Sequence, residues 1–247
     1  MVEKLVIMKP ALIKPRLIFF VLIVAFVAVA PHLHAAGTAS SSPQLEAVLN
    51  KMDATAAAFK TTQADFTWDQ FQQVVNEHDI QKGKMYFRRL NKGVEMAADI
   101  TEPEKKYVLF TDSKVRVYQP KIDQVTEYNT GKNRADFESF LVLGFGGRGH
   151  DLPKTFDVHY LGNEDIQGVH TAKLELVPKS QRVRNTFSRI LLWIDNDRGV
   201  SVQQQFFDPA GDYRIASYSN IELNSKIADN VFKLKTTGNT RTVSPGF

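Results

Sequence analysis

Apolar and polar residues alternate along residues 83–120, most regularly between residues 94 and 100. Four apolar residues share one side of the alternating part: Val94, Met96, Ala98 and Ile100. A period of two is typical of a β-strand with one dry face and one wetter face. Turn residues lie at 91–93, 101–103 and 111–114, and strands joined by such short turns pair antiparallel. The segment is therefore predicted to be a β-meander whose apolar face is covered or holds a ligand.

A helical period precedes the meander. Ser42 and Pro43 are typical of a helix N-cap followed by proline in the first turn. Apolar residues then recur at intervals of three and four, at Leu45, Val48, Leu49, Met52, Ala56 and Phe59. This spacing predicts an amphipathic helix that packs its apolar stripe on the sheet.

Strand patterns occupy most of the remaining chain. A strand from residue 64 carries Phe66, Trp68 and Val74 on one side. Further strands are predicted at 80–90, 107–110, 115–118, 122–128, 155–161, 169–177, 186–195, 200–208 and 213–223. The pattern predicts a mainly β fold with an antiparallel sheet of about eleven strands and two helical segments. Such a sheet closes into a barrel, pairs with a second sheet or keeps a partly open cavity.

Residues 133–143 interrupt the β pattern with Phe137, Phe140 and Leu141 at helical spacing, which predicts a short amphipathic helix. Residues 144–149 match the G-x-G-x-x-G fingerprint of dinucleotide sites, but that fingerprint follows a strand and opens a helix. The glycines are instead interpreted as a flexible hinge or a helix C-cap, and a hinge would let the helix move as a cover over the sheet. The polar end of the chain, residues 235–247, is expected to be loose.

The beginning of the chain differs from the rest. Lys4, Lys9, Lys14 and Arg16 precede an apolar run at 17–30, and small residues follow at 35–37. This order predicts a cleavable signal peptide at 1–35, which would direct export, and a single domain at 36–247. The alternative is a membrane anchor, but the run falls short of the roughly 20 residues that span a bilayer.

The charge of the chain is concentrated in this leader. The whole chain has a formal net charge of +4, of which residues 1–35 supply +3 through four basic side chains and Glu3, leaving about +1. Nucleic-acid binding needs a basic surface and is not expected. The chain has no cysteine, which excludes disulfides and an N-terminal lipid modification.

No residue pattern points to catalysis. His78, His150, His159 and His170 show no paired metal-ligand spacing, so surface or strand-edge roles are expected for them. No serine stands in a G-x-S-x-G elbow. We therefore expect no enzymatic activity, no metal and no cofactor.

Short motifs are distributed over nearly the whole chain after the leader. They are Ala64-Asp65-Phe66, Thr101-Glu102-Pro103, residues 110–114, 117–120, 176–179 and 187–190, and Asp229 with Phe232. In order and spacing they resemble the periplasmic outer-membrane lipoprotein carrier family, LolA. The resemblance implies an unclosed antiparallel β half-barrel lidded by helices, which carries acylated lipoproteins across the periplasm.

The resemblance also implies positions for the site. Counting back from Pro103 places Met96 and Ala98 where the family has inward aromatic residues, and Lys92 where it has the basic residue that latches the lid. The implied lipid-binding residues are Val94, Met96, Ala98, Ile100, Phe66, Trp68, Leu109, Phe137, Phe140 and Leu141. Apolar surface suffices for an acyl chain, because each buried methylene contributes roughly 0.8 kcal/mol.

The leading hypothesis is a periplasmic carrier that shields the acyl chains of lipoproteins and delivers them toward the outer membrane. The resemblance implies acylated lipoproteins or other lipids as ligands, and an inner-membrane donor complex and an outer-membrane acceptor as partners. The alternative is an envelope sensor of lipids or lipoproteins on the same fold. A monomer is expected, because a carrier exposes the mouth of its cavity.

Overall fold

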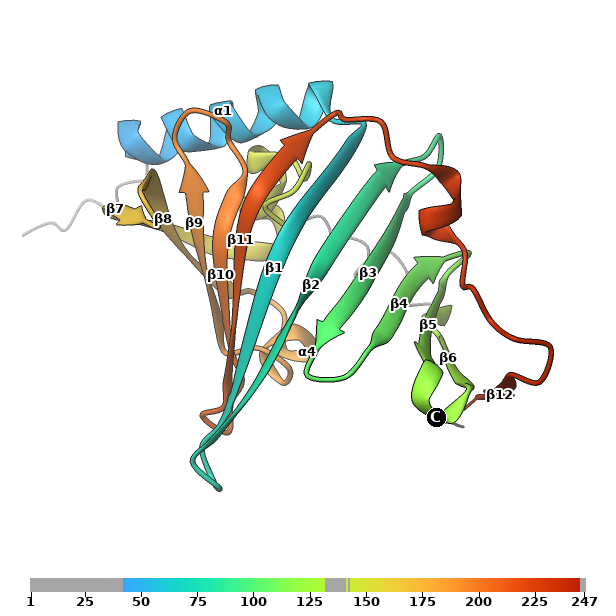
Figure 1. The fold of residues 1–247 in the computed structure, drawn as a ribbon. Coiled ribbons are helices and arrows are strands. Elements are labelled where there is room, and N and C mark those ends of the chain that lie inside the picture. The colour runs from blue at the N-terminus through green and yellow to red at the C-terminus, as the bar shows by residue number, and fades with distance from the viewer. Residues whose placement is uncertain (1–41, 132–140, 142, 245–247) are drawn as a thin grey trace, which may run out of the picture. The chain divides into compact units, whose positions relative to one another are not determined.

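One twisted sheet dominates the computed structural model, which describes residues 42–131, 141 and 143–244 (Figure 1). Its strands are β1 (Thr61–Gln72), β2 (Glu77–Arg89), β3 (Val94–Glu102), β4 (Lys106–Thr111), β5 (Lys114–Gln119), β6 (Gln124–Asn129), β7 (Phe156–Ile166), β8 (Val169–Pro178), β9 (Arg189–Asp195), β10 (Ser201–Phe207), β11 (Tyr213–Leu223) and β12 (Arg241–Val243). Its helices are α1 (Pro43–Ala58), α3 (Leu152–Thr155), α4 (Gln181–Arg184) and the 3-10 turns η1 (Pro120–Ile122), η3 (Gly149–Asp151) and η4 (Asp229–Phe232). The expected signal peptide at 1–35 and most of the expected helix at 133–143 lie outside the described residues.

The strands lie in the order β12-β6-β5-β4-β3-β2-β1-β11-β10-β9-β8-β7, so β7 and β12 are the edges of a sheet that does not close. This order confirms the predicted mainly β, unclosed half-barrel. The sheet has twelve strands instead of about eleven because β12 forms inside the segment expected to be loose. That expectation is wrong for Arg241–Val243, which pair in parallel with β6, while the other neighbouring strands pair antiparallel.

Tight turns join neighbouring strands where the sequence predicts them. Asp112 and Ser113 between β4 and β5 both have positive φ, 51° and 62°, as a two-residue hairpin turn of this kind requires. Val74 lies in the turn between β1 and β2 with 94% of its surface exposed. The prediction that Val74 continues the strand is therefore wrong, because the chain has already begun to reverse there.

Helix α1 lies across the ends of the strands (Figure 1). The Ser42 hydroxyl oxygen accepts a hydrogen bond from the Leu45 backbone N–H at 3.1 Å, which confirms the predicted N-cap. The stripe that contains Leu45, Leu49 and Met52 is buried against apolar side chains of β8 and β9. The amphipathic helix thus covers the part of the sheet farthest from β3.

The glycine run at residues 144–149 is tightly packed, so the interpretation of this run as a flexible hinge is wrong. Phe145 is 1% exposed, and Gly146 is buried with a φ of 101°. A Cβ atom on Gly146 would lie 2.6 Å from the Phe59 ring, and one on Gly149 would lie 2.4 Å from the Leu49 carbonyl oxygen. Glycine is required here because backbone and side chains approach closely. The run therefore ties the end of α1 to the sheet.

Candidate functional site

The face of the sheet that packs against α1, here called the inner face, carries a continuous apolar cluster. Its buried members on the strands are Ala64, Phe66, Met85, Phe87, Met96, Ala98, Ile100, Phe110, Ala216 and Tyr218. Register explains the continuity, because Phe87, Met96 and Phe110 lie directly opposite one another on β2, β3 and β4. Val94 is partly buried and packs against this cluster, so the four alternating residues of β3 do share one face.

Aromatic side chains extend the cluster toward β1 and β11. The ring centroids of Phe66 and Trp68 lie 4.5 Å apart, and Phe145 meets Tyr218 edge to face at 4.6 Å. Leu141 is partly buried against the same cluster. Phe137 and Phe140 lie outside the described residues. The structure thus brings together all the predicted lipid-binding residues that it describes, with one exception.

The exception is Leu109, which lies on the opposite face, here called the outer face. Leu109 stands directly opposite Ala97, and both are buried in a separate cluster with Phe232 of η4. They line a cavity of about 130 Å³ under the C-terminal segment. Leu109 is one residue out of phase with Val108 and Phe110, and the period of two therefore excludes it from the inner face.

The outer side of β3 is also less open to water than predicted. Glu95 is 15% exposed and accepts hydrogen bonds from the Arg88 guanidinium at 2.7 and 3.0 Å and from the Thr111 hydroxyl at 3.2 Å. Arg88 also bonds Asp229 and lies over the Phe232 ring at 4.3 Å. The C-terminal segment therefore covers the strand on its outer side.

Lys92, the residue expected to latch the lid, lies exposed in the turn between β2 and β3. Arg89 is instead the basic residue that contacts the end of α1. The Arg89 guanidinium donates to the Ala56 carbonyl at the end of α1 and to the Gly146 carbonyl, both at 2.8 Å. It also lies 5.1 Å from the Phe59 ring centroid. Counting back from Pro103 gave Lys92, which lies in the turn, whereas Arg89 is the last residue of the preceding strand β2. The period of two would have found it, since Arg89 follows the inward Phe87 by two residues.

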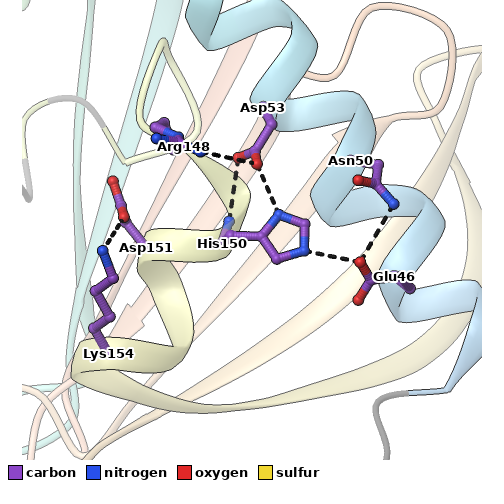
Figure 2. A network of polar contacts seen from close by, with 7 residues as sticks. All are labelled: Glu46, Asn50, Asp53, Arg148, His150, Asp151 and Lys154. Atoms are coloured by element: carbon purple, nitrogen blue, oxygen red, sulfur yellow. Dashed lines mark hydrogen bonds and ion pairs between the residues drawn. The ribbon is translucent and has the colours of Figure 1, made fainter.

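A second link joins α1 to the chain after the glycine run, as Figure 2 shows. His150 lies between two carboxylates of α1, with its Nδ1 2.7 Å from Asp53 and its Nε2 2.9 Å from Glu46. The His150 backbone N–H also donates to Asp53 at 3.2 Å, and Arg148 lies 3.6 Å from the same carboxylate. Sequence reasoning missed this role because the partners lie about a hundred residues away.

Charge sets the protonation of this network. Hydrogen bonds to Glu46 and then to Asp53 raise the pKa of His150 above its ordinary value. Burial raises the pKa of Asp53, but the hydrogen bonds from His150 outweigh burial, and the Asp53 pKa is lowered. The network therefore favours a protonated histidine between ionised carboxylates.

The buried polar side chains of Tyr218 and Gln204 are paired, whereas the buried Thr62 hydroxyl opposite Phe87 has no partner among the described residues. The buried Tyr218 hydroxyl donates to the Gln204 side-chain oxygen at 3.4 Å, and the Gln204 amide donates to the Leu143 carbonyl at 2.6 Å. Burial raises the pKa of Tyr218, which therefore stays neutral. No group of His and acidic side chains in the described part of the chain could hold a metal ion, and no helix there is long and apolar enough to cross a membrane.

Residues 57–235 match the family described as outer membrane lipoprotein carrier protein LolA. The chain belongs to this family. Its members are lipid-binding or carrier proteins rather than enzymes. No curated protein matches the sequence.

Solved structures share the fold of this LolA-family chain at low sequence identity. MucB is 12% identical with a TM-score of 0.50 over 78% of this chain, which spans only 64% of the MucB chain. An uncharacterised conserved protein from Thermus thermophilus is 12% identical with a TM-score of 0.52, over 82% of this chain and 99% of its own. At this level of identity, the two similarities concern the fold alone.

Proposed function

We propose that this LolA-family chain is a periplasmic carrier that holds the acyl chains of lipoproteins on its inner face and delivers them toward the outer membrane. The observation that carries the proposal is the continuous apolar cluster around Met96, Ala98 and Ile100 on a sheet that does not close. Each methylene removed from water contributes roughly 0.8 kcal/mol, so an acyl chain needs no polar contact to bind.

Release and uptake are proposed to involve the end of α1. Arg89 and His150 both join α1 to the chain that follows residue 143, one through carbonyl oxygens and the other through carboxylates. Loss of these polar contacts would weaken the hold of that segment on α1, and its apolar contacts through Leu143 and Leu152 would have to separate as well. The partners proposed for this exchange are an inner-membrane donor complex and an outer-membrane acceptor.

Export is part of the proposal. Residues 1–35 would be removed as a signal peptide, leaving one lipid-binding domain at 36–247. Sequencing of protein from an osmotic-shock fraction should give an N-terminus at Ala36 or Gly37. Recovery of the full-length chain in membranes alone would instead identify an anchor.

A second candidate function is a sensor of envelope lipids or lipoproteins. The observation that favours it is the fold shared with MucB, a protein that has been solved in complex with MucA. Mass spectrometry of lipid and protein that co-purify from the periplasm separates the two. A carrier should bring acylated protein or lipid, whereas co-purification of a membrane-protein partner without lipid would favour the sensor and contradict the carrier.

A further inference from the structure

The inner face changes from apolar to polar toward the turn between β1 and β2. Along β11 its residues are Tyr218, Ala216 and Arg214, and those directly opposite on β1 are Phe66, Trp68 and Gln70. Residues directly opposite in an antiparallel pair share a face. Tyr218 and Ala216 belong to the apolar cluster, so Arg214 stands in the first polar row beyond it.

Arg214 differs from the other arginines in the described part of the chain, because it makes no hydrogen bond or ion pair there. Every other described arginine interacts with another residue: Arg88, Arg89, Arg116, Arg148, Arg182, Arg184, Arg189, Arg198 and Arg241. Arg214 is exposed, so its unpaired guanidinium is available to an anion.

The surroundings of Arg214 are those of a half-open site. The side chain reaches solvent, yet desolvation by the surrounding protein lowers the pKa of its guanidinium, which the nearby Tyr218 partly offsets. Its direct neighbours on the same face are the uncharged Gln70 on β1 and Phe206 on β10. The only carboxylate in this row among the described neighbours of β1 is Asp79, which lies beyond Gln70 on β2 and accepts the Gln81 amide at 3.0 Å. No carboxylate therefore stands directly beside Arg214 in this row, and the exposed side chain can meet an anion from solution.

We propose that Arg214 binds the anionic head group of a lipid whose acyl chain lies along the inner face toward Phe66. The guanidinium fork matches a phosphate or a carboxylate, and the apolar cluster begins one row away. The amide- and ester-linked acyl chains of a lipoprotein carry no charge, so an anionic lipid is a ligand class beyond them. The proposal rests on the proposed acyl-binding function of the inner face.

The test uses three ligands with the same sixteen-carbon chain: hexadecyl phosphate, hexadecanoate and hexadecanol. Each displaces a neutral fluorescent probe, N-phenyl-1-naphthylamine, from the purified protein at pH 8. Arg214→Gln should weaken both anionic ligands, or the phosphate alone, by about tenfold to a hundredfold and leave hexadecanol unchanged. Loss for the phosphate alone identifies a phospholipid as the source, and loss for both identifies anionic lipids in general.

Two variants control for charge and folding. Arg189→Gln removes the same side chain from the outer face of β9, where Arg189 lies over Phe207, and should leave all three affinities unchanged. Arg214→Lys keeps the charge without the guanidinium fork and should retain part of the preference for anions. Equal loss for all three ligands, or no loss for any, in Arg214→Gln overturns the anion site alone. Failure of the unchanged protein to bind any ligand, hexadecanol included, overturns the proposed function itself.

Discussion

Arg89 shows how a single side chain connects three parts of this fold. It leaves β2 on the inner face, ends at two carbonyl oxygens 2.8 Å away and covers the Phe59 ring. Hydrogen bonds from a charged donor typically contribute about 1.5–3 kcal/mol each. The position therefore holds the end of α1 and the glycine run against the sheet.

We predict that Arg89→Gln lowers the free energy of unfolding by about 2 kcal/mol, because neither carbonyl keeps a charged donor. Urea unfolding followed by tryptophan fluorescence measures the change. Lys92→Gln, at the exposed turn position, is the matched control and should change stability by less than about 0.5 kcal/mol. A larger loss of unfolding free energy for Lys92→Gln than for Arg89→Gln would show that Lys92, and not Arg89, holds the end of α1.

His150 predicts a pH dependence of the link to α1. Its pKa in the folded chain is raised, so its contribution to stability is fully present below its ordinary pKa of 6.5 and is lost as the pH rises through the raised value. The Asp53 pKa is lowered, so its contribution is present above its ordinary pKa and is lost in acid. The link is strongest between these limits.

His150→Gln should therefore destabilise the protein more at pH 5.5 than at pH 8.5. The effect is expected to be small, because the side chain is 37% exposed and solvent screens its charge. Urea unfolding of both proteins at the two pH values measures the difference. An equal loss at both pH values would show that the protonated histidine contributes nothing.

At the scale of elements, the glycine run gives the sharpest prediction. Gly146→Ala should lower the free energy of unfolding by about 2–4 kcal/mol, because it combines a left-handed backbone with overpacking against Phe59. Gly162→Ala is the matched control, since Gly162 has a φ of 109° and no atom within 4 Å of the added Cβ. Thermal and urea unfolding compare the two. Equal losses would mean that only backbone strain matters and that the run is loosely packed.

The helices and strands also show which features of the fold could be predicted from the sequence. Alternation predicted β3 and its inward face, and helical spacing with a serine cap predicted α1, because both patterns are local. The burial of Glu95 and Leu109 could not be predicted, since it depends on η4 returning from more than a hundred residues away. The role of the glycine run was wrongly predicted for a similar reason. The sequence shows that residue 146 has no side chain, but only the fold shows that the Phe59 ring packs against it.

At the scale of the whole molecule, this LolA-family chain is an open sheet whose inner face carries its largest apolar cluster among the described residues. The two edges, β7 and β12, do not meet, so the inner face keeps an unclosed side. The sequence predicted this architecture through the resemblance to the LolA family. Phe66, Trp68 and the four alternating residues of β3 lie on the inner face as predicted. Leu109 and Lys92 were misplaced because strand phase and long-range contacts decide their surroundings.

The most direct measurement of the central claim compares the two faces of the sheet. Met96→Asp places a carboxylate where the acyl chain is proposed to lie, at a desolvation cost of several kcal/mol, so binding of a fluorescent fatty acid should weaken at least about tenfold. Ile80→Asp is the control, because Ile80 is 47% exposed and pairs with Asp69 on the outer face. It should bind like the unchanged protein. Glu95→Lys is unsuitable as a control, since it breaks the pair with Arg88.

Met96 is 8% exposed, so circular dichroism must first show that Met96→Asp is folded. Trp68→Ala, at a partly buried position of the same cluster, tests the face independently and should also weaken binding. Both inner-face variants should lose fatty-acid affinity while Ile80→Asp keeps it. Equal affinity in all folded variants, or a loss confined to Ile80→Asp, would contradict the assignment of the inner face as the lipid-binding surface.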